Sequence, residues 1–178
     1  MKAMRALYTI GHSTREIGEF IALLQECNIT QLIDIRTIPK SRHNPQYSQE
    51  ELRKSLAEID IDYIYMQNLG GLRSATRPSM NGAWRNTSFR NYADYMQTDE
   101  FRHGVEELVQ LATQKITAIM CAEAVPWRCH RSLVSDALLA RDVSVCEIIS
   151  KNSIRPHRMT SFAVVNGTEV TYPKVGID

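Results

Sequence analysis

The residues best suited to chemistry gather between positions 116 and 140. Cys121 and Glu123 close a short apolar run, and a second group with the sequence Cys-His-Arg occupies positions 129–131. A cysteine thiolate is a strong nucleophile, and carboxyl and imidazole groups exchange protons with a reacting centre when their pKa values suit the working pH. We therefore expect Cys121 to act as a nucleophile, with Glu123 or His12 as its acid or base partner.

The Cys-His-Arg group is expected at the start of a helix over residues 127–140. Pro126 suits a first helical turn, and apolar residues then recur at helical spacing. Free N–H groups and the helix dipole favour anions there, so Cys129, His130 and Arg131 are expected to hold a phosphate or carboxylate, or Cys129 itself is expected to be a thiolate. We expect Arg131→Ala to abolish that binding and to leave the fold intact.

The spacing and the kinds of these residues bear on three other possibilities: a phosphatase loop, a redox-active cysteine pair and a zinc site. A phosphatase loop is excluded because Arg128 lies one place too far from Cys121. Cys121 and Cys129 lack the C-x-x-C spacing of a redox-active pair. A zinc site is a further alternative, and its candidate ligands are Cys121, Cys129, His130, His12 and Glu123. Because no unambiguous fourth ligand accompanies the two cysteines and His130, we expect no bound metal.

These residues require a scaffold of alternating strands and helices. Strands are expected at residues 5–10, 31–35, 61–66, 116–120 and 143–149. Helices are expected after the capping boxes Ser13/Glu16 and Ser48/Glu51, at 92–96, at 99–114 and at 127–140. This alternation predicts one α/β domain over residues 1–178, with a mainly parallel five-stranded sheet and helices on both faces. Asn166-Gly167 predicts a C-terminal β-hairpin over residues 160–173.

Polar residues follow four of the expected strands. They are His12 and Ser13, then Asp34 and Arg36, then Gly70 and Gly71, and finally Cys121 and Glu123. The carboxyl ends of parallel strands meet at one edge of a sheet, where ligands bind. We therefore expect these residues to form one site, in which Asp34 orients His12 or pairs with Arg36.

Two basic segments favour an anionic ligand. Arg36 precedes a loop at 37–47 that has two prolines and contains Arg42, and the long segment 69–90 carries four arginines (Arg73, Arg77, Arg85 and Arg90) beside Trp84 and Phe89. We expect a lid that holds a small phosphorylated or nucleotide-like substrate through guanidinium groups. The alternative is a nucleic-acid-binding module that uses segments 36–43 and 73–90, whose binding would weaken steeply with salt.

Composition narrows the class of protein. The 178 residues are 43% hydrophobic and 23% charged, with a formal net charge of +1, which gives no global field for nucleic acid or a membrane. The sequence has no signal peptide or long apolar run, so we expect a cytosolic protein without a membrane partner. Four cysteines are too few for a disulfide scaffold. Neither a cofactor nor an oligomeric state is indicated.

Motifs in this order resemble a family of bacterial and archaeal proteins, the domain-of-unknown-function family 488. They are TIGHS at 9–13, DIR at 34–36, LGG at 69–71, CAE at 121–123 and CHR at 129–131. The resemblance covers roughly residues 7–149 and leaves the hairpin outside. It implies an intracellular α/β domain and supplies no reaction. Members of the family often carry a histidine at the position of Glu147.

Overall fold

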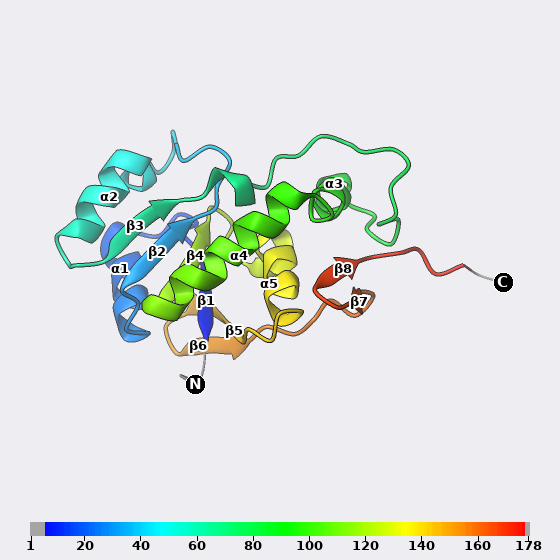
Figure 1. Cartoon of the computed structure of the whole chain (residues 1–178). Helices are drawn as coiled ribbons and strands as arrows, with labels where there is room; N and C mark the ends of the chain where they lie inside the picture. The colour runs from blue at the N-terminus through cyan, green and yellow to red at the C-terminus, as the bar shows by residue number, and fades with distance from the viewer. Residues whose placement is uncertain (1–5, 177–178) are drawn as a thin grey trace.

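The structure, a computed structural model, describes residues 6–176. A six-stranded sheet in the order β3-β2-β4-β1-β5-β6 forms its centre (Figure 1). Its strands are β1 (Leu7–Gly11), β2 (Gln31–Asp34), β3 (Asp62–Tyr65), β4 (Thr117–Cys121), β5 (Val145–Ser150) and β6 (Ser153–Pro156). The first five are parallel, and β6 pairs antiparallel with β5.

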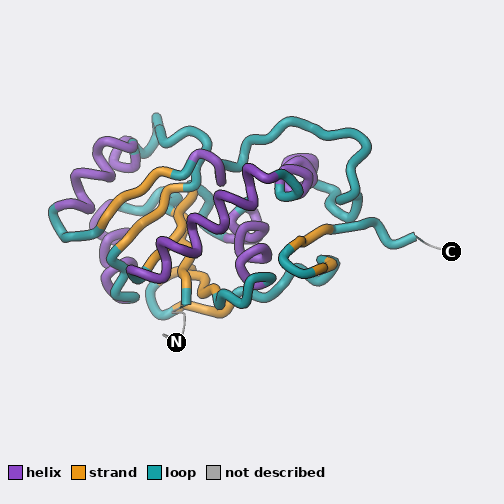
Figure 2. The backbone as a smooth tube through the Cα atoms, viewed as in Figure 1, coloured by secondary structure: helices purple, strands orange, loops and turns teal. Residues whose placement is uncertain are grey.

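Helices cover both faces of this sheet, which confirms the predicted α/β class. They are α1 (Ile17–Glu26), α2 (Gln49–Ala57), α3 (Thr87–Tyr95), α4 (Asp99–Gln114) and α5 (Arg131–Leu139). Three short 3-10 helices are η1 (Pro45–Tyr47), η2 (Gln67–Leu69) and η3 (Pro126–Arg128). Helices α1 and α2 pack on one face, whereas α3, α4 and α5 pack on the other. In Figure 2, α4 crosses in front of the strands.

Strand β4 contributes side chains to the hydrophobic cores on both faces of the sheet. All five of its residues are buried, as expected of a parallel strand covered on both sides. Ala118 and Met120 belong to the core under α1 and α2, while Ile119 between them belongs to the opposite core. Because β4 lies between β2 and β1, its end at Cys121 lies in the middle of the sheet.

The sequence-based prediction of a capping box at Ser13 is wrong. Helix α1 begins at Ile17, and Glu16 is its N-cap without a side-chain cap bond. Ser13 has a left-handed backbone with φ of 49°. The reason is tertiary: the N–H groups of His12 and Ser13 donate to the Cys121 and Ala122 carbonyls, each at 2.9 Å, and so hold the chain against the end of β4. Ser48 is the N-cap of α2, but its side chain also makes no cap bond.

Other boundaries differ from expectation in informative ways. The sheet has a sixth strand, β6, which the sequence did not reveal because it is a largely exposed edge strand ending at Pro156. Helix α3 starts at Thr87, earlier than predicted, because the Asn86 side chain accepts bonds from Ser88 N–H and Phe89 N–H at 2.9 and 3.2 Å. The 126–140 region divides into η3 and a shorter α5.

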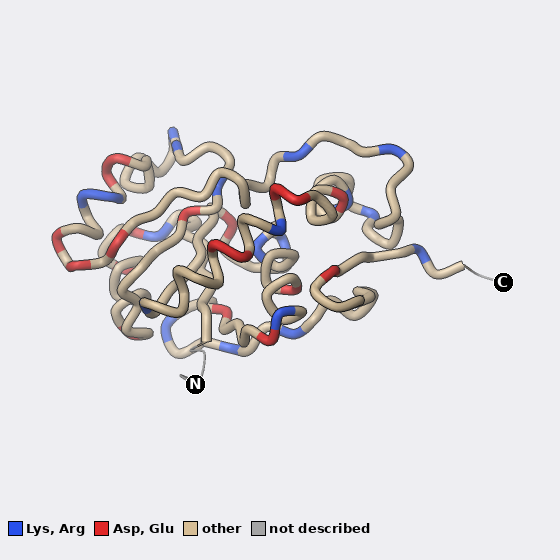
Figure 3. Tube along the Cα trace, viewed as in Figure 1, with Lys and Arg blue, Asp and Glu red and all other residues tan. Residues whose placement is uncertain are grey.

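The C-terminal hairpin is present as β7 (Val164–Asn166) and β8 (Glu169–Thr171), with Gly167 at φ of +62° in the turn. A long loop runs from Gly70 to Asn86 and carries arginines without acidic residues, as Figure 3 shows by its blue positions. Within residues 6–176, no helix combines the length and the apolar character needed to cross a membrane.

Candidate functional site

A pocket of about 500 Å³ lies at the carboxyl ends of β1, β2 and β4, which are neighbours in the sheet. We call it the thiol pocket because both Cys121 and Cys129 line it. Parallel strands bring their carboxyl ends to one edge, so three segments distant in sequence meet here. The pocket is large enough for a small metabolite.

The structure brings seven of the twelve predicted site residues to this pocket. They are His12, Arg36, Gly71, Cys121, Glu123, Cys129 and His130. The other five do not line it, and they are Ser13, Asp34, Arg42, Gly70 and Arg131. Asp34 and Arg131 are fully buried behind it, which gives them supporting positions instead of contact with a ligand.

Arg131 is a buried cation held against the two thiols. Its side chain is 0% exposed, and its Nε donates to Cys121 Sγ at 3.0 Å. The guanidinium also donates to Thr9 Oγ1 at 3.3 Å and to the Glu123 carbonyl at 2.8 Å. Among residues 6–176, no carboxylate forms an ion pair with it. The predicted ligand contact of Arg131 is therefore replaced by an internal one, and an intact fold is not expected after Arg131→Ala.

The two neighbouring cysteine thiols have pKa values that are shifted in opposite directions. Cys129 Sγ accepts the Arg131 backbone N–H at 3.4 Å, and Cys121 Sγ accepts from Arg131 Nε at 3.0 Å. Burial alone would raise the pKa of Cys129, but the neighbouring Cys121 thiol and the Arg131 charge lower it to about 7. Burial and the neighbouring Cys129 raise the pKa of Cys121 well above its usual value. Arg131 donates to both sulfurs, and we assign the thiolate to Cys129 because its pKa is lowered whereas that of Cys121 is raised.

His130 is fixed beside Cys129 in one protonation pattern. Its Nε2 lies 3.0 Å from the Ile35 carbonyl, which only accepts, so Nε2 carries a proton. In the neutral ring, Nδ1 is then free to accept from Cys129 when this residue is in its thiol form, with the sulfur 3.5 Å away. Burial lowers the pKa of His130, which favours this neutral form. The pair thus resembles a nucleophile and its proton acceptor.

Gly71 leaves the space that His130 occupies. A Cβ at position 71 would lie 2.6 Å from His130 Nδ1 and 2.9 Å from its Cγ. Gly70 similarly leaves space for Thr37, whose Oγ1 would be 2.7 Å from a Cβ. The two glycines predicted to bind ligand therefore act in this structure by allowing close packing under the pocket.

We expect Gly71→Ala to displace the His130 ring and to cost about 1–3 kcal/mol of stability, as overpacking does. The displaced ring should lose its buried position, so its pKa should rise toward the ordinary ~6.5. NMR titration of the His130 ring and urea unfolding measure both effects. Gly18→Ala is the control, because nothing lies within 4 Å of its Cβ. An unchanged His130 titration would contradict this account.

His12 is held as a neutral ring. Its Nδ1 contacts the Ser13 carbonyl at 2.8 Å, and its Nε2 faces Arg36 Nη1 at 3.4 Å. Since arginine only donates, Nε2 must accept and Nδ1 must carry the proton. The ring stacks on Tyr47 with 4.2 Å between centroids. Burial, with the Arg36 charge, lowers the pKa of His12 to about 4, so it is a weak base near neutral pH.

Asp34 and Arg36 pair with each other, which is one of the two predicted alternatives. Arg36 Nε and Nη2 donate to the two carboxylate oxygens at 2.9 and 2.7 Å. Tyr63 donates its hydroxyl to Asp34 at 2.5 Å, and Arg36 Nη1 donates to the Tyr47 carbonyl at 2.8 Å. With its donors engaged in this way, Arg36 is suited to position His12 and the loop that follows β2.

The mouth of the pocket carries exposed charged side chains of both signs. Lys40, Arg128 and Glu123 line it and are exposed. Arg42, predicted to bind the ligand, is exposed outside the lining. None of the four arginines of the predicted lid lines the pocket. Arg73, for example, lies 3.6 Å above the Tyr95 ring and donates to the Gly70 carbonyl.

Several lining residues were not singled out from the sequence. They are Thr37, Ile38, Ser41, Leu72, Asn86 and Ser88, while Phe89 was named only as an aromatic residue beside the four arginines of the loop. The polar run Asn86-Thr87-Ser88 was a detectable N-cap signal that would have placed the start of α3 near this pocket.

A family described as "Domain of unknown function DUF488" matches residues 16–138, well over half of the chain. The chain belongs to this family. No curated protein and no solved structure matches it. The motifs at 34–36, 69–71, 121–123 and 129–131 fall inside the segment matched by the family, whereas TIGHS at 9–13 lies before it.

Position 147 lies outside the segment that matches the family. Here Glu147 accepts hydrogen bonds from His157 Nδ1 at 2.7 Å and Arg155 Nε at 2.9 Å. An imidazole is thus present beside this position, but it comes from the segment after β6. The thiol pocket does not include it.

No cofactor can be assigned from the family. Within the described residues, no group of three or more His, Cys, Asp or Glu side chains has an arrangement that could hold a metal ion. Cys121, Cys129 and His130 lie together, but Arg131 occupies the position beside the sulfurs. A guanidinium there supplies the positive charge that a metal would otherwise bring to two cysteines.

Proposed function

We propose that this protein is an enzyme that uses a Cys129 thiolate to attack an electrophilic centre in a small anionic substrate. The observation that carries the proposal is the buried Arg131, whose guanidinium contacts a thiol and has no carboxylate partner among residues 6–176. An uncompensated buried cation is costly. A thiolate on the adjacent cysteine pair offsets that cost.

The pocket supplies the other groups that such a reaction needs. Lys40 and Arg128 at the mouth attract an anion, and Glu123 gives selectivity against ligands with excess negative charge. In its thiol form Cys129 donates to His130 Nδ1, 3.5 Å from the sulfur, and with a pKa of about 7 the thiol loses its proton to solvent near neutral pH while His130 stays neutral. The sulfur then forms a bond to the electrophilic atom, and the leaving group departs with the electrons of the broken bond. Cys129 replaces Cys121 as the favoured nucleophile because of its lower pKa.

Alkylation tests this proposal without knowledge of the substrate. We expect iodoacetate to modify Cys129 first, at a rate that rises with pH around a midpoint of about 7, because the thiolate is the reacting form. Cys146 is an internal reference, since burial raises its pKa. Peptide mass spectrometry resolves the rate for each cysteine. If Cys129 titrates no lower than an ordinary thiol at ~8.5, the nucleophile assignment is wrong.

The anion preference has its own control. Iodoacetate carries a negative charge and iodoacetamide does not, so the ratio of their rates at Cys129 reports on the mouth of the pocket. Lys40→Gln combined with Arg128→Gln should lower this ratio, whereas Arg42→Gln, an exposed arginine outside the lining, should leave it unchanged. Equal ratios in all three proteins would remove the anionic substrate from the proposal. A cytosolic location, where thiols stay reduced, suits this chemistry.

A further inference from the structure

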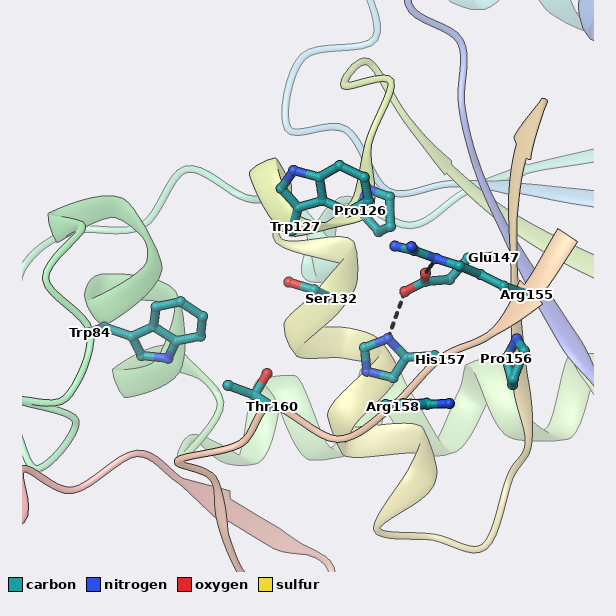
Figure 4. A pocket seen from close by; sticks show the side chains of 10 residues that line it. All are labelled: Trp84, Pro126, Trp127, Ser132, Glu147, Arg155, Pro156, His157, Arg158 and Thr160. Carbon is teal, nitrogen blue, oxygen red and sulfur yellow. Dashed lines mark hydrogen bonds and ion pairs between the residues drawn. The ribbon is translucent and has the colours of Figure 1, made fainter. Parts of the chain in front are cut away.

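A second cavity of about 590 Å³ lies across the turn at η3 from the thiol pocket. We call it the tryptophan cavity. Its lining is Trp84, Pro126, Trp127, Ser132, Glu147, Arg155, Pro156, His157, Arg158 and Thr160 (Figure 4). It shares no lining residue with the thiol pocket. The function proposed above uses none of these side chains.

Two indole rings stand at opposite parts of this cavity. In Figure 4, Trp84 lies on one side and Trp127 above, with the charged residues on the far side from Trp84. Trp127 is 54% exposed, and the Arg155 guanidinium lies 4.9 Å from its ring. Trp84 is held in place by Phe89, Phe162 and Tyr172 at centroid distances of 5.0, 4.8 and 5.3 Å. The cavity thus has one fixed aromatic wall and one open aromatic surface.

The charged side of the cavity rests on a paired histidine. His157 contacts Asp136 through Nε2 at 2.8 Å and Glu147 through Nδ1 at 2.7 Å. Carboxylates accept, so both ring nitrogens donate and the ring is an imidazolium. Burial alone would lower the pKa of His157, but these two hydrogen bonds raise it to about 9. The three groups satisfy one another and form a rigid floor.

Positive charge remains available above that floor. Arg155 uses Nε for Glu147, and its two terminal nitrogens have no hydrogen-bond partner among residues 6–176. Arg158 is exposed at the rim and forms no ion pair within the same residues. Arg155, His157 and Arg158 outnumber the two carboxylates, Glu147 and Asp136, that face them. The cavity therefore carries a surplus cation beside aromatic surface.

We propose that the tryptophan cavity binds a planar aromatic ligand that bears an anionic group. The aromatic ring would lie against Trp127, and the anion would accept hydrogen bonds from Arg158 and Arg155. Indole surfaces favour aromatic partners, and the planar arginine fork matches a carboxylate or phosphate. A volume of about 590 Å³ lies within the range of small-ligand sites. This inference does not depend on the chemistry of the thiol pocket.

Isothermal titration calorimetry of the full chain tests the two requirements separately. Adenosine 5′-monophosphate is the probe that combines ring and anion, while adenosine and inorganic phosphate each supply one of them. We expect the nucleotide to bind at least about tenfold more tightly than either part. If phosphate binds as tightly as the nucleotide, the aromatic requirement is wrong. Two other probes, 4-nitrophenyl phosphate and indole-3-acetate, also combine an aromatic ring with an anionic group. If none of these three ligands binds at concentrations on the order of 1 mM, the proposal fails.

Variants locate the bound probe. Trp127→Leu and Arg158→Gln change exposed side chains and should each weaken nucleotide binding about tenfold. Trp127→Phe keeps a ring and should retain most of the affinity. Lys40→Gln, in the thiol pocket, and Arg42→Gln, outside both cavities, should have no effect. Binding that is lost in Lys40→Gln and kept in Trp127→Leu would place the ligand in the thiol pocket and overturn the proposal, and such a result would leave the thiolate chemistry itself untouched.

Discussion

Arg131→Met is expected to lower the free energy of unfolding by about 3–5 kcal/mol, the cost of removing one partner from a buried charged group. The variant loses the bonds to Cys121, Thr9 and the Glu123 carbonyl together. Without the guanidinium, burial should dominate, and the pKa of Cys129 should rise from about 7 to above the ordinary ~8.5. Urea unfolding and the pH dependence of Cys129 alkylation measure the two effects.

Two variants separate charge from packing in this experiment. Arg141→Met lies beyond the other end of α5 and removes bonds to the Ala137 and Thr168 carbonyls, so it should cost only about 1 kcal/mol. Arg131→Lys keeps the charge and should keep the pKa of Cys129 low despite lost hydrogen bonds. If Arg131→Met is no less stable than Arg141→Met, or if Cys129 titrates as before, the buried cation does not hold the thiolate.

Asp136→Ala is expected to destabilise the protein by a similar amount, about 3–5 kcal/mol. Asp136 is 0% exposed and accepts from His157 Nε2, Tyr172 hydroxyl and Thr160 N–H at 2.8, 2.8 and 3.1 Å. These bonds attach the chain beyond β6 to helix α5. Their loss leaves a buried imidazolium with one carboxylate instead of two. Urea unfolding measures the cost, and hydrogen exchange should show loss of protection first in β8.

The pH dependence of the unfolding free energy tests whether the charge of Asp136, paired with His157, causes this destabilisation. The pKa of His157 is raised to about 9 in the folded protein, so its stabilisation is complete below the unfolded ~6.5 and is lost as pH rises through about 9. Asp136→Asn can still accept from Tyr172 but has no charge. Its difference in stability from the wild type should therefore shrink between those two pH values. A difference that does not change with pH would assign the effect to shape alone.

Much of the fold was predictable because its signals are local and repeated. Strand β4 is a short apolar run, and α4 carries apolar residues at helical spacing. Strand β6 could not be found in this way, since an exposed edge strand needs few apolar residues. The failure at Ser13 has another origin: backbone bonds to residues 121 and 122 override the capping preference. Such contacts are set by the sheet order, which periodicity does not encode.

The site was predictable where the parallel sheet alone decides the outcome. His12, Arg36 and Cys121 meet because the ends of β1, β2 and β4 are adjacent. The roles of Arg131 and Asp136 were not predictable from helix periodicity. Every residue of α5 from 131 to 138 is buried, because other helices and the C-terminal hairpin surround it. In such a helix, polar residues point inward and become internal partners instead of surface contacts.

The turn formed by η3 separates the thiol pocket from the tryptophan cavity and contributes residues to both. Pro126 and Trp127 face the tryptophan cavity, while Arg128 and Cys129 face the thiol pocket. The turn is tied internally by bonds from the Arg128 and Cys129 N–H groups to the Val125 and Pro126 carbonyls, at 3.2 and 3.0 Å. If a ligand bound in one cavity changes the affinity of the other cavity by some factor, a ligand in the second cavity must change the affinity of the first by the same factor. Any coupling between the ligand affinities of the two cavities is therefore symmetric, even though the cavities share no side chain.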